Sequence, residues 1–293
     1  MTAVLIAGCG YTGRRLAERL LESGASVSGT ATTPSSLRRI AEAGAEALVL
    51  DLDASIDPVD VDGRLVYYCV PPPPGVGDRR LDRLLARLTG TPTRLVYLST
   101  TGVYGDHGGA RVDESTPPSP GTERAARRLA AEAAIREWAD SRCVSWCVLR
   151  VAGIYGPGRL PIDRLRRAVP AIDPQEAAPG NRIHVTDLVS ACVAAGFASI
   201  ADRRIYNVSD GNEESATGFL CRVARIAHLP APPFISRDEA LRDPSAQAFL
   251  TESRRVDNRR MLHELGVSLE YGDLDAGIRA SLEPGSDYSM SRR

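Results

Sequence analysis

One short segment near the N-terminus combines residue types and spacing that could support chemistry. Gly8-Cys9-Gly10-Tyr11-Thr12-Gly13 has the GxGxxG spacing. Between a strand and a helix, Gly8 would form the tight turn, Gly10 would let the backbone approach a pyrophosphate, and Gly13 would let the helix pack closely on the sheet. The segment therefore predicts a dinucleotide-binding turn. Its predicted contacts are Gly8, Gly10, Tyr11, Thr12 and Gly13.

The elements that must position this turn are short apolar runs that alternate with amphipathic segments. The runs span residues 3–7, 25–30, 47–50, 65–70, 94–98 and 144–149, with a further strand expected over 204–208 and helices over 122–139 and 186–197. Continuous apolar strands of this kind indicate a parallel sheet covered by helices on both faces. We therefore predict an α/β fold, a doubly wound parallel sheet of the Rossmann type with a small C-terminal substrate lobe.

The domain boundaries follow from where this pattern changes. Beyond Gly158 the chain becomes irregular and rich in proline, and the regular pattern returns for the helix and strand that precede residue 210. The predicted core therefore comprises 1–158 and 183–210, and the predicted lobe comprises 159–182 and 211–283. Residues 284–293 are expected to form a flexible tail.

Composition limits the possible partners. The 36 basic residues nearly balance the 37 acidic ones, so no electrostatic footprint for nucleic acid or an anionic membrane is expected. No apolar stretch approaches the length of a membrane span and no leader is recognisable, which predicts a cytoplasmic protein. The six cysteines lack CxxC spacing, so we expect reduced core residues and no metal site.

The end of the second strand bears on which cofactor is preferred. The run Gly29–Ser36 contains hydroxyl side chains and no acidic residue that would repel a 2′-phosphate, and Arg38 and Arg39 follow it. These residues favour NADP over NAD, with Thr30, Thr32 and Arg38 as predicted contacts. Alternatively, Ser35 or Ser36 only caps a helix whose arginines face solvent.

Several longer motifs follow the glycine turn in a set order. They are Asp51-Leu52, Leu98-Ser99-Thr100-Thr101-Gly102-Val103-Tyr104-Gly105, Val151–Arg159, Arg182–Leu188 and Ile205–Asp210. This series resembles the NAD-dependent epimerase/dehydratase family of extended short-chain dehydrogenases/reductases. The resemblance implies a Rossmann core with the C-terminal part over the nicotinamide end of the cofactor. It also implies cofactor contacts at Asp51, Leu52, Val70, Pro71, Pro72, Ser99 and Arg128.

The chain departs from this family at its catalytic helix. Family members use a Ser or Thr, a tyrosine and a lysine four residues later; here the hydroxyl is Thr100, but the tyrosine position holds Arg124 and the lysine position Arg128. A guanidinium stays protonated, so Arg124 could bind an anion or stabilise an oxyanion but could not act as a base. The alternative is that both arginines lie on a solvated helix face.

Other side chains could replace the missing acid or base. Tyr104 and Glu123 are the candidates for this acid or base, and with Thr100 and Arg124 they form the predicted catalytic set. Alternatively, Tyr104 only supports the loop, as it does in the family, and Glu123 is an acidic residue in the first turn of a helix, where the helix dipole favours it. Only a short segment, 159–182, precedes the Ile-His-Val run, so a nucleotide-sugar substrate is not favoured. Arg159 and Arg182 are expected to anchor a smaller anionic substrate.

Two functions remain open from the sequence. The first is an atypical NAD(P)-dependent oxidoreductase or epimerase/dehydratase-like enzyme that acts on a small molecule. The second is a non-catalytic NAD(P)-binding sensor or regulatory module. A polar site formed by Thr100, Tyr104, Glu123 and Arg159 would favour the enzyme, and an apolar, closed nicotinamide end would favour the sensor. The expected oligomeric state is a monomer or a homodimer.

Overall fold

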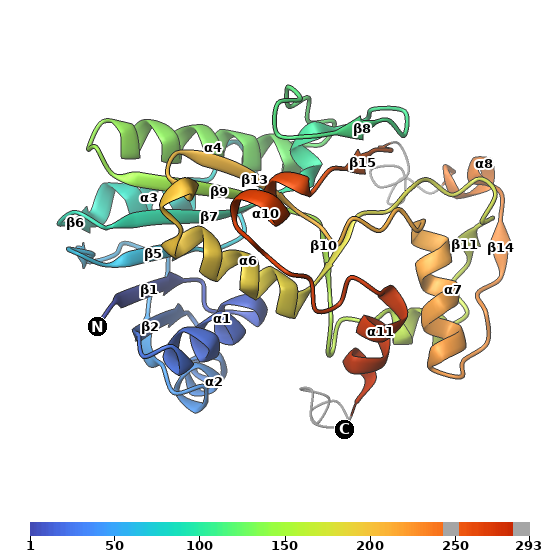
Figure 1. The fold of residues 1–293 in the computed structure, drawn as a ribbon, viewed down its shortest axis with the longest axis horizontal. Coiled ribbons are helices and arrows are strands. Elements are labelled where there is room, and N and C mark those ends of the chain that lie inside the picture. Colours follow the sequence, from blue (N-terminus) through green and yellow to red (C-terminus); the bar gives the residue numbers. More distant parts are fainter. Residues whose placement is uncertain (243–251, 284–293) are drawn as a thin grey trace.

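The computed structural model describes residues 1–242 and 252–283 (Figure 1). Its centre is a seven-stranded parallel sheet in the order β13-β9-β7-β5-β1-β2-β3. The strands are β1 (Ala3–Ala7), β2 (Ser26–Ala31), β3 (Glu46–Val49), β5 (Leu65–Tyr68), β7 (Arg94–Thr100), β9 (Ser145–Val151) and β13 (Arg204–Val208). This confirms the predicted doubly wound α/β fold.

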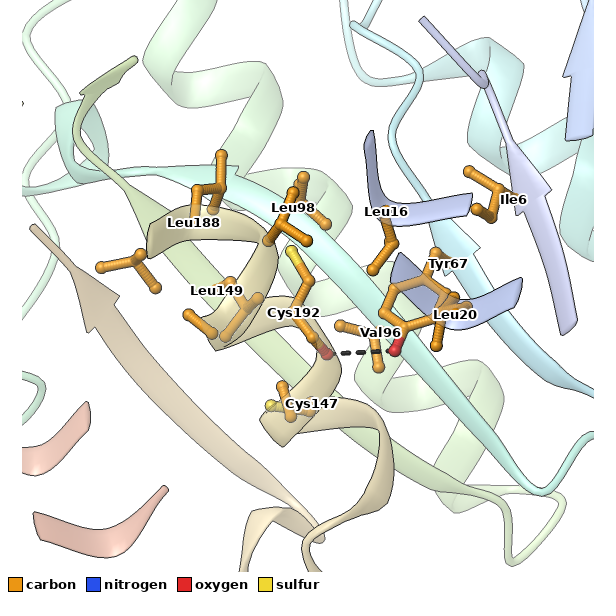
Figure 2. Close-up of a cluster of buried hydrophobic side chains, with 14 of the residues drawn as sticks. Ile6, Leu16, Leu20, Tyr67, Val96, Leu98, Cys147, Leu149, Leu188 and Cys192 are labelled. Carbon is orange, nitrogen blue, oxygen red and sulfur yellow. Dashed lines mark hydrogen bonds between the residues drawn. The ribbon is translucent and has the colours of Figure 1, made fainter. Parts of the chain in front are cut away.

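Helices cover both faces of the sheet because successive side chains of each strand point to opposite sides. Val4 and Ile6 of β1 pack with α1 and α6, whereas Leu5 and Ala7 pack with α3 and α4. Figure 2 shows the first of these clusters, in which the buried Tyr67 hydroxyl donates to the carbonyl of Cys192 at 3.0 Å. The helices are α1 (Tyr11–Glu22), α2 (Pro34–Glu42), α3 (Arg79–Arg87), α4 (Glu123–Asp140) and α6 (Val185–Phe197).

A separate apolar cluster lies in the C-terminal part of the chain. Leu165 of α5, Phe219 of α7 and Ile278 of α11 pack together, away from the two sheet faces. The elements here are α5 (Ile162–Arg166), α7 (Ala216–Ile226), α8 (Arg237–Ala240), α11 (Leu274–Leu282), and the paired strands β10 (Gly153–Tyr155) with β12 (Arg182–His184) and β11 (Ala171–Ile172) with β14 (Phe234–Ile235). The predicted division into core and lobe stays a prediction, and the predicted tail lies outside the described residues.

One C-terminal segment lies against the sheet rather than in this cluster. Met261 of α10 (Arg259–Glu264) packs in the same core as α1 and α6, and β15 (Arg255–Val256) pairs with β8 (Arg111–Val112). These residues fall inside the range that the sequence assigned to the lobe. The remaining elements are β4 (Val59–Asp60), β6 (Leu88–Thr89), η1 (Thr101–Tyr104) and η2 (Ser199–Ala201).

Two local expectations were wrong. Thr33, not Ser35 or Ser36, caps α2, because its hydroxyl accepts from the amide of Ser36 while Pro34 begins the helix. Cys143 is exposed, whereas we expected a core residue, because it lies in the turn between α4 and β9 with a positive φ of 53°. All six cysteines are free thiols.

Candidate functional site

A cavity of about 650 Å³ lies along the carboxyl ends of the sheet strands, where ligands bind in open α/β sheets. It runs from the turn after β3, past the glycine turn after β1, to the ends of β7 and β9. Its lining includes Gly8, Cys9, Gly10, Tyr11, Thr12, Gly13, Thr30, Thr32, Ser36, Asp51, Leu52, Asp53, Cys69, Val70, Pro71, Arg80, Leu98, Ser99, Arg124, Arg128, Val151, Ile154 and Arg159. The cavity thus brings together most of the cofactor contacts that the sequence predicted.

The protein's own packing explains two of the three glycines. Gly8 has φ +81°, and a Cβ there would lie 2.7 Å from Cγ2 of Val70. Thr30 holds this turn, because its Oγ1 accepts from the amide of Gly8 at 3.0 Å. A Cβ on Gly13 would lie 3.1 Å from Cγ2 of Ile6, so this glycine lets α1 pack against β1.

Gly10 differs, because no close protein contact requires a glycine there. The nearest atom to a Cβ on Gly10 would be the carbonyl oxygen of Gly8 at 4.0 Å, and Gly10 itself faces the cavity. It is also the N-cap of α1, which has no side-chain cap, whereas α2, α3 and α4 are capped by Thr33, Asp78 and Thr122. The start of α1 thus has no side-chain cap and borders the cavity, as a pyrophosphate site requires, and the turn fits a dinucleotide.

The end of the cavity at β3 carries carboxylates. Asp51 and Asp53 line it, and Nε of Arg80 donates to Oδ1 of Asp53 at 2.8 Å. The hydrogen bond from Arg80 holds the pKa of Asp53 below its usual range. Arg80 also donates to the carbonyl of Pro71 at 3.0 Å and so links the loops that follow β3 and β5.

The end of the cavity at β7 rests on a buried polar network. The Ser99 hydroxyl donates to Oε1 of Glu132 at 2.5 Å, and Nη2 of Arg150 lies 2.8 Å from Oε2 of the same carboxylate. Thr100 points elsewhere, because its Oγ1 accepts from the amide of Gly102 at 3.1 Å. Ser99 therefore lines the cavity and Thr100 does not.

Three arginines converge on this end of the cavity. Arg124 and Arg128 come from successive turns of α4, and Arg159 comes from the turn after β10. Nη1 of Arg128 donates to the carbonyl of Leu98 at 2.9 Å, which ties α4 to the end of β7. The guanidinium of Arg159 lies 3.9 Å from the ring centre of Tyr11, and burial lowers its pKa. A guanidinium nevertheless stays protonated, so each arginine brings a positive charge to the site.

Tyr104 does not belong to the cavity, which contradicts its expected catalytic role. Its side chain is 0% exposed, and its hydroxyl donates to Oδ1 of Asn207 at 2.8 Å. Arg150 lies 4.9 Å from its ring centre, and burial raises the pKa of the phenol. A hydroxyl enclosed in this way cannot exchange a proton with a ligand in the cavity.

Arg182 also lies outside the cavity, which contradicts its expected role as a substrate anchor. Its guanidinium donates to the carbonyls of Glu214 and Ser215 and lies 4.5 Å from the ring centre of Phe219. These bonds tie β12 to the start of α7. Arg182 therefore stabilises the C-terminal cluster.

The other predicted site residues outside the lining are exposed or turned away. Glu123 has a side chain that is 92% exposed and lies 3.5 Å from Nη1 of Arg127. Arg38 is exposed on α2, and Pro72 follows the lining residue Pro71 without joining it. The site that would have favoured the enzyme, formed by Thr100, Tyr104, Glu123 and Arg159, is therefore not assembled, yet this end of the cavity is polar rather than apolar.

Sequence reasoning missed several residues that line the cavity. Asp53 and Arg80 lie beyond the motifs, although Asp53 follows the recognised Asp51-Leu52 pair, and Ser36 ends the Gly29–Ser36 run without having been chosen as a contact. Cys9 and Cys69 also line it; burial raises the pKa of each thiol to about 12, so neither is a ready nucleophile. In residues 1–242 and 252–283 no group of side chains is arranged to hold a metal ion, and no helix there is long and apolar enough to cross a membrane.

Comparison with known families identifies the chain. The model of the NAD-dependent epimerase/dehydratase family matches residues 77–209, which include β7, η1, α4 and β9. The chain belongs to this family. The matched residues include α4, the helix that carries Arg124 and Arg128.

Individual relatives of this family member cover nearly its whole length. A functionally unknown conserved protein from Silicibacter pomeroyi DSS is 33% identical, with a TM-score of 0.80 over 96% of this chain and 98% of that one. Protein YeeZ of Escherichia coli (strain K12) is 26% identical over 93% of this chain and 97% of its own length. The UDP-glucose 4-epimerase of Thermus thermophilus, solved with NAD, is 22% identical with a TM-score of 0.74 over 96% of this chain and 97% of that one, and it shares the fold.

Proposed function

We propose that this protein binds a nicotinamide dinucleotide in the cavity along the sheet edge and acts as an oxidoreductase or epimerase/dehydratase-like enzyme on a small substrate. The observation that carries the proposal is Gly10: an added Cβ would lie 4.0 Å from the nearest atom among the described residues, and Gly10 opens a helix without a side-chain cap at the cavity. Gly8, Gly10 and the first amides of α1 would hold the diphosphate, and Asp51 and Leu52 would flank the adenine.

The residues near the nicotinamide end would bind and orient rather than exchange protons. A bound nicotinamide would supply the hydride donor or acceptor. Arg128 would contact the nicotinamide riboside from its position against Leu98, and Arg124 would stabilise negative charge on a substrate oxygen. Among the described residues no histidine, lysine or glutamate lines the cavity, so the proton would be exchanged with water.

We further propose that NADP is preferred to NAD. Thr32 and Ser36 line the cavity at the end of β2, and no acidic residue stands between Ala31 and Ser36. Nη2 of Arg39 donates to the Ser36 hydroxyl at 3.3 Å, so Arg39 lies nearer the lining than Arg38, which the sequence favoured. Arg39 would therefore contact the 2′-phosphate.

Calorimetric titration of the protein with NADP, NADPH, NAD and NADH tests these proposals. We expect NADPH to bind more tightly than NADH, and Arg39→Gln to weaken NADPH by about 10-fold while leaving NADH unchanged. Arg38→Gln is the matched control and should change neither affinity. Failure of all four dinucleotides to bind would overturn the proposed function, and equal affinities for NADH and NADPH would overturn the preference.

A non-catalytic NAD(P) sensor is the second candidate. It is favoured by the enclosed Tyr104 hydroxyl and by the absence of histidine, lysine and glutamate among the described lining residues. An absorbance screen for nicotinamide oxidation or reduction with small carbonyl and hydroxy-acid compounds separates the two. Turnover with any of them establishes the enzyme, and tight binding without turnover favours the sensor.

A further inference from the structure

The cavity holds opposite charges at its two ends. At the β3 end Asp51 lies beside the Asp53–Arg80 ion pair, which leaves one net negative charge there, and Arg124, Arg128 and Arg159 lie at the β7 end. Four strand spacings separate β3 from β7 in the sheet order, roughly 19 Å. This exceeds the Debye length of about 8 Å at physiological ionic strength, so the carboxylates do not neutralise the arginines.

Among the described residues none of the three guanidiniums forms an ion pair with a carboxylate, although the buried Asp78 carboxylate acts on Arg128 electrostatically from a longer distance. Within residues 1–242 and 252–283, Arg124 has no hydrogen-bond or ion-pair partner, and Arg128 donates only to the neutral oxygens of Tyr97 and Leu98. The guanidinium of Arg159 contacts the ring of Tyr11. This end of the cavity therefore has a net positive charge.

The position of Arg124 in α4 is electrostatically unfavourable. It is the second residue of the helix, after the Thr122 cap and Glu123, where the helix dipole already places partial positive charge. The adjacent carboxylate does not compensate it, because Glu123 pairs with Arg127 at 3.5 Å. A bound anion would offset this repulsion.

The composition of the chain separates the two substitutions on α4. All 36 basic residues are arginines, and the sequence contains no lysine. Arg128 therefore keeps a positive charge at the lysine position, as an arginine because this chain uses arginine for every basic residue. Arg124 instead puts a cation where the family pattern has a neutral phenol, so it adds a positive charge to the cavity.

We propose that the substrate carries a carboxylate or phosphate group and that Arg124 is the residue that selects it. The guanidinium binds such oxyanions through two parallel hydrogen bonds, and Arg128 and Arg159 supply further positive charge beside it. The inference rests on the proposed function, because it places the anion next to a bound dinucleotide.

The test titrates the NADH-saturated protein with malonate, with its neutral diamide malonamide, and with inorganic phosphate. We expect malonate or phosphate to bind at least about 10-fold more tightly than malonamide, and Arg124→Gln to abolish that difference. Arg136→Gln is the matched control, because Arg136 lies on the same helix, does not line the cavity and makes no ion pair with Glu123. It should keep anion affinity within about two-fold of the original protein.

The outcomes separate this inference from the function on which it rests. Tighter binding of malonate indicates a carboxylate substrate, tighter binding of phosphate indicates a phosphorylated one, and both support the inference. Equal affinity for malonate and malonamide, or an unchanged affinity in Arg124→Gln, overturns it. Anion binding that NADH abolishes also overturns it, because the anion then occupies the position of the dinucleotide phosphates. Failure of NADH to bind counts against the proposed function, and the cofactor-free protein then tests anion selection by the same variants.

Discussion

Glu132 and Arg150 form a buried ion pair of 2.8 Å directly behind the Ser99 end of the cavity, with side chains only 3% and 4% exposed. Glu132 projects from α4 and Arg150 from β9, so the pair fixes the helix that carries Arg124 and Arg128 against the sheet. The Ser99 hydroxyl donates to the same carboxylate. The position of the cavity's arginine end therefore depends on this pair.

Removing one partner of this pair should be strongly destabilising. We expect Arg150→Met to lower the free energy of unfolding by about 3–5 kcal/mol, because the Glu132 charge would be left buried and unpaired. Urea unfolding followed by the fluorescence of Trp138 and Trp146 measures the loss. Arg203→Met is the control: it removes an exposed pair with Asp140 at 2.9 Å and should cost less than about 1 kcal/mol. Similar losses in the two variants would contradict the structural role of Glu132 and Arg150.

Alanine at Gly8 and alanine at Gly10 should fail in different ways. Gly8→Ala should destabilise the fold by about 2 kcal/mol or more, because φ is +81° and Val70 occupies the space. Gly10→Ala should cost about 1 kcal/mol at most, yet weaken dinucleotide binding by at least about 10-fold, because its methyl group would enter the cavity. Thermal unfolding and calorimetric titration distinguish these effects. Normal NADH affinity in a folded Gly10→Ala protein would contradict the assigned role of Gly10.

Tyr104→Phe should affect stability and leave ligand binding unchanged. The hydroxyl contributes a buried hydrogen bond to Asn207, so its removal should cost about 1 kcal/mol. Dinucleotide affinity should stay within about two-fold of the original value, and any turnover found in the substrate screen should persist. A loss of turnover by about 100-fold or more, the scale of a lost general acid, would restore Tyr104 as a catalytic candidate.

Asp210→Asn should stabilise the protein at neutral pH. Burial raises the pKa of Asp210 to about 6, and its Oδ2 makes no hydrogen bond within the described residues. The folded state therefore binds the Asp210 proton more tightly than the unfolded state does. The contribution of Asp210 to the free energy of unfolding is greatest below the ordinary pKa near 3.8 and is lost as the pH rises through about 6. At pH 7 the variant should gain on the order of 3 kcal/mol.

Unfolding curves at pH 4.5 and pH 7 check this sign. The gain in Asp210→Asn should shrink at the lower pH, where the original side chain is largely protonated when folded. Asp113→Asn is the contrasting control, because the hydrogen bond from Ser115 lowers the pKa of Asp113 and this variant should be less stable than the original protein at neutral pH. A gain at Asp210 that does not change with pH would contradict the interpretation.

Much of the fold followed from local pattern alone. The apolar runs at 3–7 and 94–98 had to be buried on both faces, so they predicted β1 and β7 of a parallel sheet, and the glycine turn indicated where α1 begins. The family resemblance implied cofactor contacts at Asp51 and Ser99, and both line the cavity at the carboxyl ends of the strands. These features depend on periodicity and on backbone geometry, both of which short segments carry.

The catalytic candidates were harder to predict because side-chain direction depends on packing between distant segments. Tyr104 and Thr100 lie in the same motif as Ser99. The Tyr104 hydroxyl nevertheless donates to Asn207 of β13, and the Thr100 hydroxyl accepts from the amide of Gly102. Arg182 and Arg159 looked alike as candidate anchors. The carbonyls of Glu214 and Ser215 bind the first, and the second stays at the cavity beside Tyr11.

The sequence by itself determined the α/β fold, the family, and the absence of lysine from the whole chain. Only the tertiary structure decided which arginines line the same cavity and which form hydrogen bonds elsewhere in the protein. The physical reason is that a guanidinium side chain reaches partners from any neighbouring element. Whether its charge remains available to a ligand depends on the acceptors that folding brings within reach, and spacing along the chain does not record them.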